Sequence, residues 1–288
     1  MTRADGRKYN ELRDVTITPD FNKFAEGSVL IRCGDTVVLC TASVEERVPP
    51  HVKPGCGWVT AEYSMLPRAN RERSRRDVDK LKLSSRSAEI QRLIGRSLRA
   101  AVDMKRLGER TITIDANRQR SRRDVDKLKL SSRSAEIQRL IGRSLRAAVD
   151  MKLLGERTVT IDCDVLQGDG GTRTASVTGG FVALALACRW LVKEGYIARM
   201  PIKHYVAGVS AGIVDDTAVL DLPYAEDSRA QVDLNCIMNE QGEIIEIQGT
   251  GEGRAFTVAE QQELVALCAK GNRELIAKQK EVLGDILR

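Results

Sequence analysis

Hydrophobic and polar residues alternate along the N-terminal part of the chain, with the spacing of strands that have one buried face. Val15 and Ile17 begin this pattern, which continues through residues 28–32, 35–43 and 57–65. A Cys-Gly-Asp turn separates the second run from the third, which is typical of a hairpin. We therefore predict four strands in this part of the chain.

Later in the chain the apolar spacing changes, and it predicts helices as well as strands. Apolar residues three and four positions apart predict an amphipathic helix from Ile137 to Val149. Strands and helices that alternate, together with hairpins, indicate an α+β fold with a mixed sheet, and no linker divides the predicted single domain of residues 1–288. The other predicted elements are strands at 157–167, 205–214, 217–222, 230–238 and 243–248, an apolar helix at about 175–193, and a last helix at about 258–287 that starts with a capping box of Thr257 and Glu260.

Residues 69–115 are repeated almost letter for letter as residues 116–162, with three differences in 47 positions. Helical solenoids have repeats of this length, but they need about three or more copies and tolerate divergence between them. Two near-identical copies instead indicate a segmental duplication inside an ordinary globular fold. The second copy runs directly into the predicted strand 157–167, whereas the strand of the first copy breaks off. We therefore predict that the second copy occupies the native position and that residues 69–115 are extruded from a surface loop.

The net charge of +6 arises from one copy of this repeat. Residues 69–115 hold 13 of the 46 Lys and Arg residues and 7 of the 40 Asp and Glu residues, which leaves 33 of each elsewhere. What remains is a local arginine cluster, which is either a solvated loop or a surface for phosphate backbones. The cluster comprises Arg68, Arg71, Arg73, Arg75 and Arg76, and the second copy repeats it as Arg118, Arg120, Arg122 and Arg123.

The seven cysteines are scattered and have no CxxC spacing, which indicates neither a zinc site nor a disulfide framework. The polar N-terminus does not have the pattern of a signal peptide, and no apolar run is expected to reach membrane-spanning length. Reduced cysteines and a cytoplasmic location are therefore expected.

A glycine-rich segment, residues 168–176 (GDGGTRTAS), lies between a predicted strand and a predicted helix. Glycines allow the backbone to approach an anion closely, and the helix N-terminus offers unpaired N–H groups. Arg173 adds a guanidinium suited to phosphate oxygens. The segment matches neither the dinucleotide fingerprint nor the Walker A motif. A plain glycine turn with a solvated arginine remains the alternative.

A second candidate is an acidic strip of Asp221, Glu226, Asp227 and Asp233. Carboxylates on a strand and on the loop before it can hold one Mg²⁺ ion together with waters. In the QVDLNC segment the alternating pattern turns Asp233 away from the core. An exposed acidic loop is the alternative interpretation.

One motif is misleading. Residues 208–212 (GVSAG) satisfy the G-x-S-x-G pattern of a hydrolase nucleophile elbow, which requires a following helix and a later histidine. The residues that follow predict a turn and a strand, and His51 and His204 both precede Ser210. A serine hydrolase is therefore not expected.

Several long motifs occur in a fixed order: AEYSMLPRA, SAEIQRLIGRSLRA, TVTIDCDVLQGDGGTRTAS, YAEDSRAQVDLN and GTGEGRAF. Together with DGRKYNELR near the N-terminus and KQKEVLGD near the C-terminus, they cover essentially the whole chain except one repeat copy. In these motifs the chain resembles the ribonuclease PH family. The resemblance implies a ribosomal protein S5 domain 2-like fold of mixed sheets with packed helices, shared with the exosome ring and polynucleotide phosphorylase core domains. It also implies a homo-hexamer built as a trimer of dimers.

The resemblance implies a phosphate-dependent 3′→5′ exoribonuclease that trims tRNA precursors and releases nucleoside diphosphates in a reversible reaction. Inorganic phosphate is then the co-substrate and Mg²⁺ the expected metal, held by Asp227 and Asp233, either of which could also protonate the leaving oxygen. The alternative is a catalytically impaired or misassembled RNA-binding ring, because the duplication lies beside the expected site. The implied phosphate ligands are Gly171, Thr172, Arg173 and the helix arginine that occurs as Arg86 in one copy and as Arg133 in the other. The arginine cluster, namely Arg68, Arg71, Arg73, Arg75, Arg76, Arg120, Arg122 and Arg123, would guide RNA.

Overall fold

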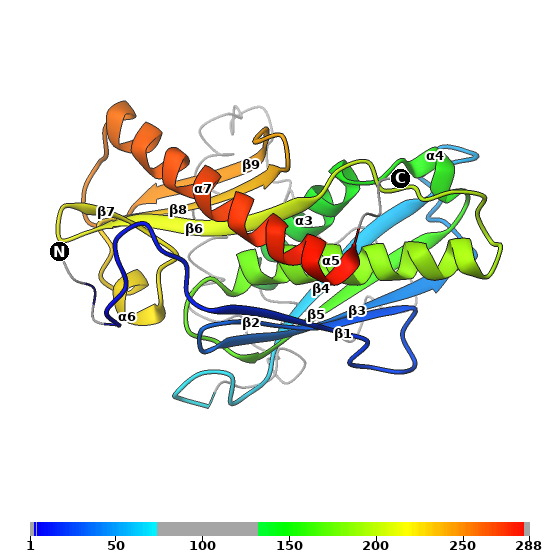
Figure 1. Cartoon of the computed structure of the whole chain (residues 1–288), viewed down its shortest axis with the longest axis horizontal. Helices are drawn as coiled ribbons and strands as arrows, with labels where there is room; N and C mark the ends of the chain where they lie inside the picture. The colour runs from blue at the N-terminus through cyan, green and yellow to red at the C-terminus, as the bar shows by residue number, and fades with distance from the viewer. Residues whose placement is uncertain (1–2, 4, 74–131, 285–288) are drawn as a thin grey trace, which may run out of the picture.

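The structure is a computed structural model that describes residue 3 and residues 5–73 and 132–284, and the side chains of residues 132 and 133 lie outside the described part. In the described part the chain forms two β-sheets with helices packed between and against them (Figure 1). The first half contains β1 (Val15–Pro19), β2 (Gly27–Cys33), β3 (Thr36–Glu45), β4 (Trp58–Met65), α3 (Ser132–Ala147), α4 (Met151–Leu154) and β5 (Thr158–Gln167). The second half contains α5 (Thr172–Lys193), β6 (Val206–Val214), β7 (Thr217–Leu220), α6 (Tyr224–Asp227), β8 (Val232–Asn239), β9 (Ile244–Gly251) and α7 (Val258–Leu283).

The first sheet has the strand order β1-β2-β3-β5-β4 and is mixed, as predicted. Its neighbouring strands pair antiparallel except β4 and β5, which run parallel. Alternate residues of β5, from Val159 to Val165, are buried, whereas those between them are half-buried. This alternation turns one face of the sheet towards the helices and confirms the predicted period of two. The second sheet is antiparallel, in the order β7-β6-β8-β9.

Helix α5 packs against both sheets, with contacts to β2 and β3 on one side and to β6 on the other. Its approach to β2 is close, because a Cβ at Gly27 would lie 2.0 Å from the carbonyl oxygen of Ala183. The helix is long and apolar enough to cross a membrane by length and composition alone, so the expectation of no such apolar run was wrong. However, 78% of its apolar window is buried inside the protein, as in the core helix of a globular fold.

Helix α3 comes from the second copy of the repeat and packs against β4 and α5. Leu140, Ile141 and Leu145, which were predicted to form its apolar face, are 2% exposed or less. Near the end of the helix, Arg146 donates a hydrogen bond to the carbonyl oxygen of Val59 in β4. The helix and strand of the second copy therefore belong to the core. Of the first copy, Ala69 is buried in the hydrophobic core, while residues 74–115 lie outside the described part, so the predicted extrusion of residues 69–115 stays a prediction.

Helix α7 contacts β6, β7 and β8, and it starts with the predicted capping box, in which Thr257 and Glu260 bond reciprocally. Figure 1 shows it crossing the second sheet diagonally. The helix ends at Leu283, earlier than predicted, because Gly284 with a φ of 64° ends it. The single predicted domain stays a prediction, although one hydrophobic core cluster contains residues of both sheets.

Candidate active site

A cavity of about 750 Å³ brings together residues from distant parts of the chain. Its lining residues include residues 168–173, which form the loop between β5 and α5 and the first two residues of α5, together with residues of α6 and β8 and residues 70–72 after β4. Three of the residues implied to bind phosphate and the two implied carboxylates are therefore lining residues of the same cavity. These are Gly171, Thr172, Arg173, Asp227 and Asp233.

The loop before α5 needs its glycines for two physical reasons. Gly170 and Gly171 have φ angles of 74° and 65°, in the left-handed region that L side chains rarely adopt. A Cβ at Gly170 would also lie 2.4 Å from the carbonyl oxygen of Leu222. Gly171 is the N-cap of a 22-residue helix, so the unpaired N–H groups of the first turn and the guanidinium of Arg173 occur together at the cavity. This combination suits a bound anion.

Two side chains hold this loop from outside the cavity. The hydroxyl of Thr36 accepts a hydrogen bond from the Asp169 N–H at 2.9 Å and donates one to the Gly170 carbonyl oxygen at 2.7 Å. The guanidinium of Arg13 donates to the carbonyl oxygens of Asp169 and Gly170. Both side chains are buried, so the loop conformation is fixed by the surrounding structure.

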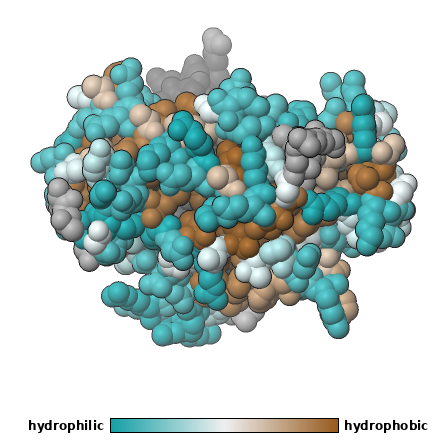
Figure 2. Space-filling model, in the orientation of Figure 1, coloured by the Kyte–Doolittle hydropathy of each residue, from teal (hydrophilic) through white to brown (hydrophobic). Residues whose placement is uncertain are grey.

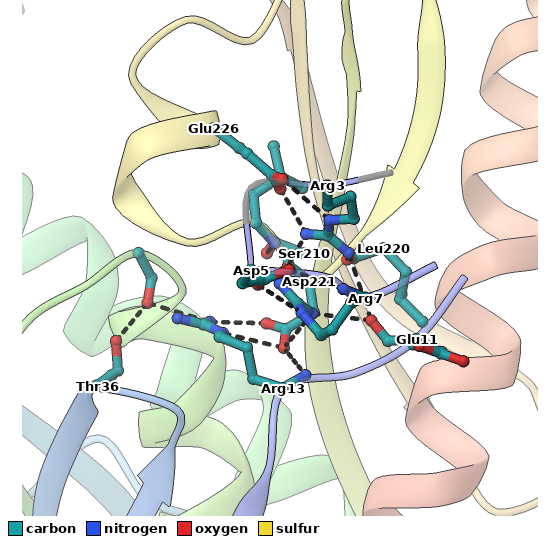
Figure 3. A network of polar contacts seen from close by, with 12 residues as sticks. Arg3, Asp5, Arg7, Glu11, Arg13, Thr36, Ser210, Leu220, Asp221 and Glu226 are labelled. Atoms are coloured by element: carbon teal, nitrogen blue, oxygen red, sulfur yellow. Dashed lines mark hydrogen bonds and ion pairs between the residues drawn. The ribbon is translucent and has the colours of Figure 1, made fainter. Parts of the chain in front are cut away.

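The four residues of the predicted acidic strip form two pairs with different surroundings. Asp221 accepts two hydrogen bonds from the side chain of Arg13, at 2.7 and 3.1 Å, and Glu226 accepts from Nε of Arg3 at 3.0 Å (Figure 3). Burial by itself would raise the pKa of Asp221, but Arg13, followed by Arg7, holds it below its usual value. These two carboxylates therefore belong to buried ion pairs, which leaves Asp227 and Asp233 as the acidic pair of the strip.

The other two acids, Asp227 and Asp233, both line the cavity. Asp233 faces it from β8, where Asn235 donates a hydrogen bond to one of its oxygens at 3.2 Å. The pKa of Asp233 is raised to about 6, first by burial and then by the like charge of Asp227, while Arg173 acts in the opposite direction. The two carboxylates and the guanidinium therefore interact through the same cavity, although they are distant in the sequence.

The network in Figure 3 connects the two sides of this cavity. Arg13 bonds both the loop at 169–170 and Asp221, which precedes α6. In addition, the carboxylate of Asp169 accepts a hydrogen bond from the backbone N–H of Tyr224 in α6, at 3.3 Å. The loop that would hold an anion and the helix that carries Asp227 are thus tied together.

Of the predicted arginine cluster, Arg71 lines the cavity. Arg68 donates a hydrogen bond to the Arg71 carbonyl oxygen, and Arg73 is exposed but is not a lining residue. Arg133 lies in the first turn of α3, but its side chain is outside the described part. The same holds for the whole of Arg75, Arg76, Arg86, Arg118, Arg120, Arg122 and Arg123.

Several lining residues were not predicted, among them Asn70, Tyr224, Asn235 and Glu252. The alternation in β8 indicated the face of Asn235. Asn70 and Glu252 lie in bends and Tyr224 lies in the four-residue helix α6, which is too short to show a period. Ser210 also lines the cavity, yet it lies within β6, which leads through a turn into β7. The absence of a helix after this serine in the described structure confirms that it is not a nucleophile elbow.

The family models and known relatives agree with this geometry. The model of the 3′ exoribonuclease family, domain 1, matches residues 11–126 and again 116–189, and each match includes one copy of the duplicated segment. The model of domain 2 matches residues 204–271. The fold and the site thus define a member of the 3′ exoribonuclease class.

The known relatives include the ribonuclease PH of Moorella thermoacetica, which is 48% identical over 287 residues, covering 99% of this chain and 96% of that protein. The ribonuclease PH of Syntrophomonas wolfei is 46% identical over 285 residues, with 99% and 100% covered. The chain therefore belongs to the 3′ exoribonuclease family, among its ribonuclease PH members.

Solved structures of lower identity share the fold. Rice (Oryza sativa) Rrp46 has a TM-score of 0.66 at 15% identity, covering 98% of this chain and 100% of that one. An archaeal exosome core has a TM-score of 0.66 at 21% identity, covering 96% and 91%. The Archaeoglobus fulgidus exosome with RNA bound to the active site has a TM-score of 0.66 at 22% identity, covering 96% and 92%.

Proposed function

We propose that this chain is a phosphate-dependent 3′→5′ exoribonuclease, which uses inorganic phosphate to release nucleoside diphosphates from RNA. The observation that carries the proposal is a single cavity that contains an anion-binding loop at 171–173 and the two carboxylates Asp227 and Asp233. Phosphorolysis must bring two anions together, the attacking phosphate and the terminal phosphodiester. Fixed positive groups and N–H dipoles in such a cavity lower the cost of that approach.

The residues have distinct roles in this reaction. Inorganic phosphate binds to the N–H groups at Gly171 and Thr172 and to the guanidinium of Arg173. One of its oxygens forms a bond to the terminal phosphorus of the RNA, and the bond from that phosphorus to the 3′ oxygen of the preceding nucleotide breaks. The proton carried by the attacking phosphate passes to this leaving oxygen. Positioning and electrostatic stabilisation are sufficient, so no histidine is required.

Asp227 and Asp233 are the residues that would hold Mg²⁺. In the described part of the chain no group of three or more His, Cys, Asp or Glu residues could hold a metal ion. A pair of carboxylates nevertheless suits Mg²⁺, which usually binds through one or two carboxylates, with waters and substrate phosphates as its other ligands. The like charge of Asp227 disfavours ionisation of Asp233, and a cation held by both carboxylates would relieve that repulsion. When bound, the ion offsets negative charge on the scissile phosphate.

The substrates that we propose are tRNA precursors and other structured RNA with 3′ tails. Arg71 at the cavity supports contact with the RNA backbone, and Arg68 lies beside it. The reverse reaction would add nucleotides from nucleoside diphosphates. The ribonuclease PH relatives, at 48% and 46% identity, support this assignment.

We also propose that the chain forms a ring of six subunits in the cytoplasm. One of the proteins that share its fold is an archaeal exosome core. Figure 2 shows hydrophobic residues gathered in a band across the middle of an otherwise hydrophilic face, which supports contact with another subunit. Over the described residues of the whole surface, the large exposed hydrophobic side chains are Tyr9, Phe21, Phe24, Leu66, Tyr196, Tyr224, Ile244 and Val258.

The duplicated segment enters the chain beside this site. We propose that the second copy is the functional one, because its helix α3 packs on β4 and its strand β5 leads directly into the loop at 168–173. Arg133 is then the helix arginine that binds phosphate. Alanine substitution of Arg133 should raise the KM for phosphate, whereas alanine substitution of Arg86 should leave it unchanged. Loss of activity from the Arg86 variant alone would reverse the assignment.

The decisive experiment incubates RNA that has a 3′ tail with and without inorganic phosphate. We expect nucleoside diphosphates in the presence of phosphate, and their loss in an Asp233→Asn variant. Asp215→Asn is the matched control, since Asp215 is an exposed residue of the β6–β7 turn and is not a lining residue. If the wild-type chain releases no diphosphates, it is an inactive RNA-binding ring or a misassembled product of the duplication.

A further inference from the structure

The hydroxyl of Thr172 has a buried partner on another strand. Tyr63 lies in β4, its side chain is 3% exposed, and its phenol oxygen is 2.8 Å from Oγ1 of Thr172. Thr172 is the first residue of α5 and lines the cavity. The contact joins residues that are 109 positions apart in the sequence. It therefore connects the first sheet to the phosphate-binding loop.

The direction of this hydrogen bond is not fixed by the distance between the oxygens, because either hydroxyl can donate. A threonine hydroxyl has one proton and two acceptor lone pairs. A fully ionised phosphate oxygen only accepts, so Thr172 can bind it through the hydroxyl only by donating that proton. The bond between Tyr63 and Thr172 must then run from the phenol to Oγ1.

We propose that Tyr63 is a positioning residue for the phosphate co-substrate. By donating to Oγ1, it turns the proton of Thr172 towards the anion and polarises the hydroxyl, so that the two bonds strengthen each other. Tyr63 itself does not touch phosphate in this arrangement. The inference rests on the proposed binding of phosphate at residues 171–173.

The first turn of α5 holds the backbone of Thr172, and Tyr63 contacts its side chain. The carbonyl oxygen of Thr172 already accepts a hydrogen bond from the hydroxyl of Ser176, at 2.8 Å, within the first turn of α5. The side chain of Thr172 could still rotate about its Cα–Cβ bond. The phenol of Tyr63 limits this rotation, because Tyr63 is held in β4, where Ala61 is buried and Met65 packs against the hydrophobic core. A preorganised donor costs less to engage than one that must be oriented on binding.

The test is a Tyr63→Phe variant, which removes one oxygen atom and keeps the ring. At saturating RNA, we expect the KM for phosphate to rise about fivefold, the factor for one neutral hydrogen bond, while the KM for RNA and the unfolding temperature stay close to wild type. Tyr205→Phe is the matched control. Tyr205 is 1% exposed, and its phenol donates to the carbonyl oxygen of Gly284, so it has a partly buried hydrogen bond but is not a lining residue of the cavity. Its KM for phosphate should not change.

The Tyr63→Phe substitution could also shift the aromatic side chain of residue 63. A double-mutant cycle tests the proposal in that case as well. Thr172→Val should raise the KM for phosphate by about tenfold or more, as expected for a hydrogen bond to a charged group. In that background Tyr63→Phe should have no further effect on the KM, because the hydroxyl that it orients is absent.

The outcomes separate this inference from the proposed function. If the wild-type chain shows no phosphate-dependent release, the proposed function fails and Tyr63 has no such role. If the wild type is active but Tyr63→Phe leaves the KM for phosphate unchanged, only the positioning role is overturned. An equal rise of this KM in Tyr205→Phe, or the same rise in the Thr172→Val background, would also overturn it.

Discussion

Replacing Asp233 with asparagine should stabilise the protein while it removes activity. Asp233 is half-buried in β8, and its pKa is raised to about 6 by burial, followed by the like charge of Asp227. Near pH 7 the folded protein therefore carries an ionised carboxylate that it disfavours. Asparagine has almost the same shape but no charge, so the substitution removes this cost and keeps a partner for the amide of Asn235.

The size of the effect follows from the raised pKa. A carboxyl group with a pKa of 3.8 in the unfolded chain and about 6 in the folded protein costs at most about 3 kcal/mol once it is ionised. Water in the open cavity screens part of this cost, so we expect a gain in stability of about 1–3 kcal/mol. Protonated Asp233 carries no such cost, so the wild-type protein has its full stability at pH values below the unfolded pKa of this carboxyl. That stability is lost as the pH rises through about 6 and Asp233 ionises in the folded protein. The stability difference between Asp233→Asn and the wild type should therefore be absent at pH values below the unfolded pKa. It should increase as the pH rises and be constant above about pH 7.

Urea unfolding at a series of pH values measures this directly, in a buffer with a chelator so that no divalent ion binds the carboxylates. Asp215→Asn is the control with the same chemical change on the surface, and its stability should stay within about 0.5 kcal/mol of wild type. A stability of Asp233→Asn that equals the wild type near pH 7 would refute the reasoning. So would a gain that has the same size at about pH 4, because an uncharged wild-type carboxyl leaves nothing to relieve.

Three further substitutions test the fold around the site. Arg13→Met should lower the free energy of unfolding by about 3–5 kcal/mol, because it leaves the buried Asp221 without its main partner, and the loss should shrink as the pH falls and Asp221 is protonated. Gly27→Ala should cost about 1–3 kcal/mol in urea unfolding, because its Cβ would overlap the Ala183 carbonyl oxygen. Thr257→Ala should cost about 1 kcal/mol through loss of the capping box of α7, measured by thermal unfolding.

Arg13→Met and Gly27→Ala each have a control substitution of the same type at a less tightly packed position. Arg254→Met breaks a half-buried pair with Glu260, which is more open to water than the pair of Arg13 and Asp221, and should change stability less than Arg13→Met. Gly253→Ala places its Cβ no closer than 3.6 Å to another atom, so it should be tolerated. If a control is as destabilising as the substitution that it accompanies, the specific contact is not the cause.

The sequence predicted the elements where a period was sustained. The alternation in β5 and the spacing of Leu140, Ile141 and Leu145 in α3 come from a single buried face, and the structure has both. The prediction that α5 begins at Ala175 was late, because the helix starts at Thr172 directly after Gly171 in the left-handed region. The short helices α4 and α6 were not predicted, since four residues do not complete a recognisable period.

The candidate site could be predicted only in part. The loop glycines and Arg173 have a local pattern, and the alternation in β8 gave the direction of Asp233. The partners of Asp221 and Glu226 could not be found in this way, because Arg13 and Arg3 lie 208 and 223 positions away. A carboxylate in an ion pair and a carboxylate at a cavity have the same appearance in a sequence, and only the packing distinguishes them.

The position of the duplication now has a structural consequence. The loop at 168–173 comes from the end of β5 in the first sheet, whereas Asp227 and Asp233 come from α6 and β8, which belong to the second half of the fold. The distance between them depends on how these parts pack, which Arg13 and α5 maintain. The duplicated residues end at 162, within β5. The rest of β5, the loop that follows it, and the segments that carry Asp227 and Asp233 therefore occur once in the chain. The second copy supplies a continuous α3 and β5, whereas Asn70, Arg71 and Glu72 at the cavity belong to the first copy, so residues of both copies contribute to the site. Arg173, Asp227 and Asp233 all lie outside the repeat, so the duplication removes none of the proposed catalytic groups.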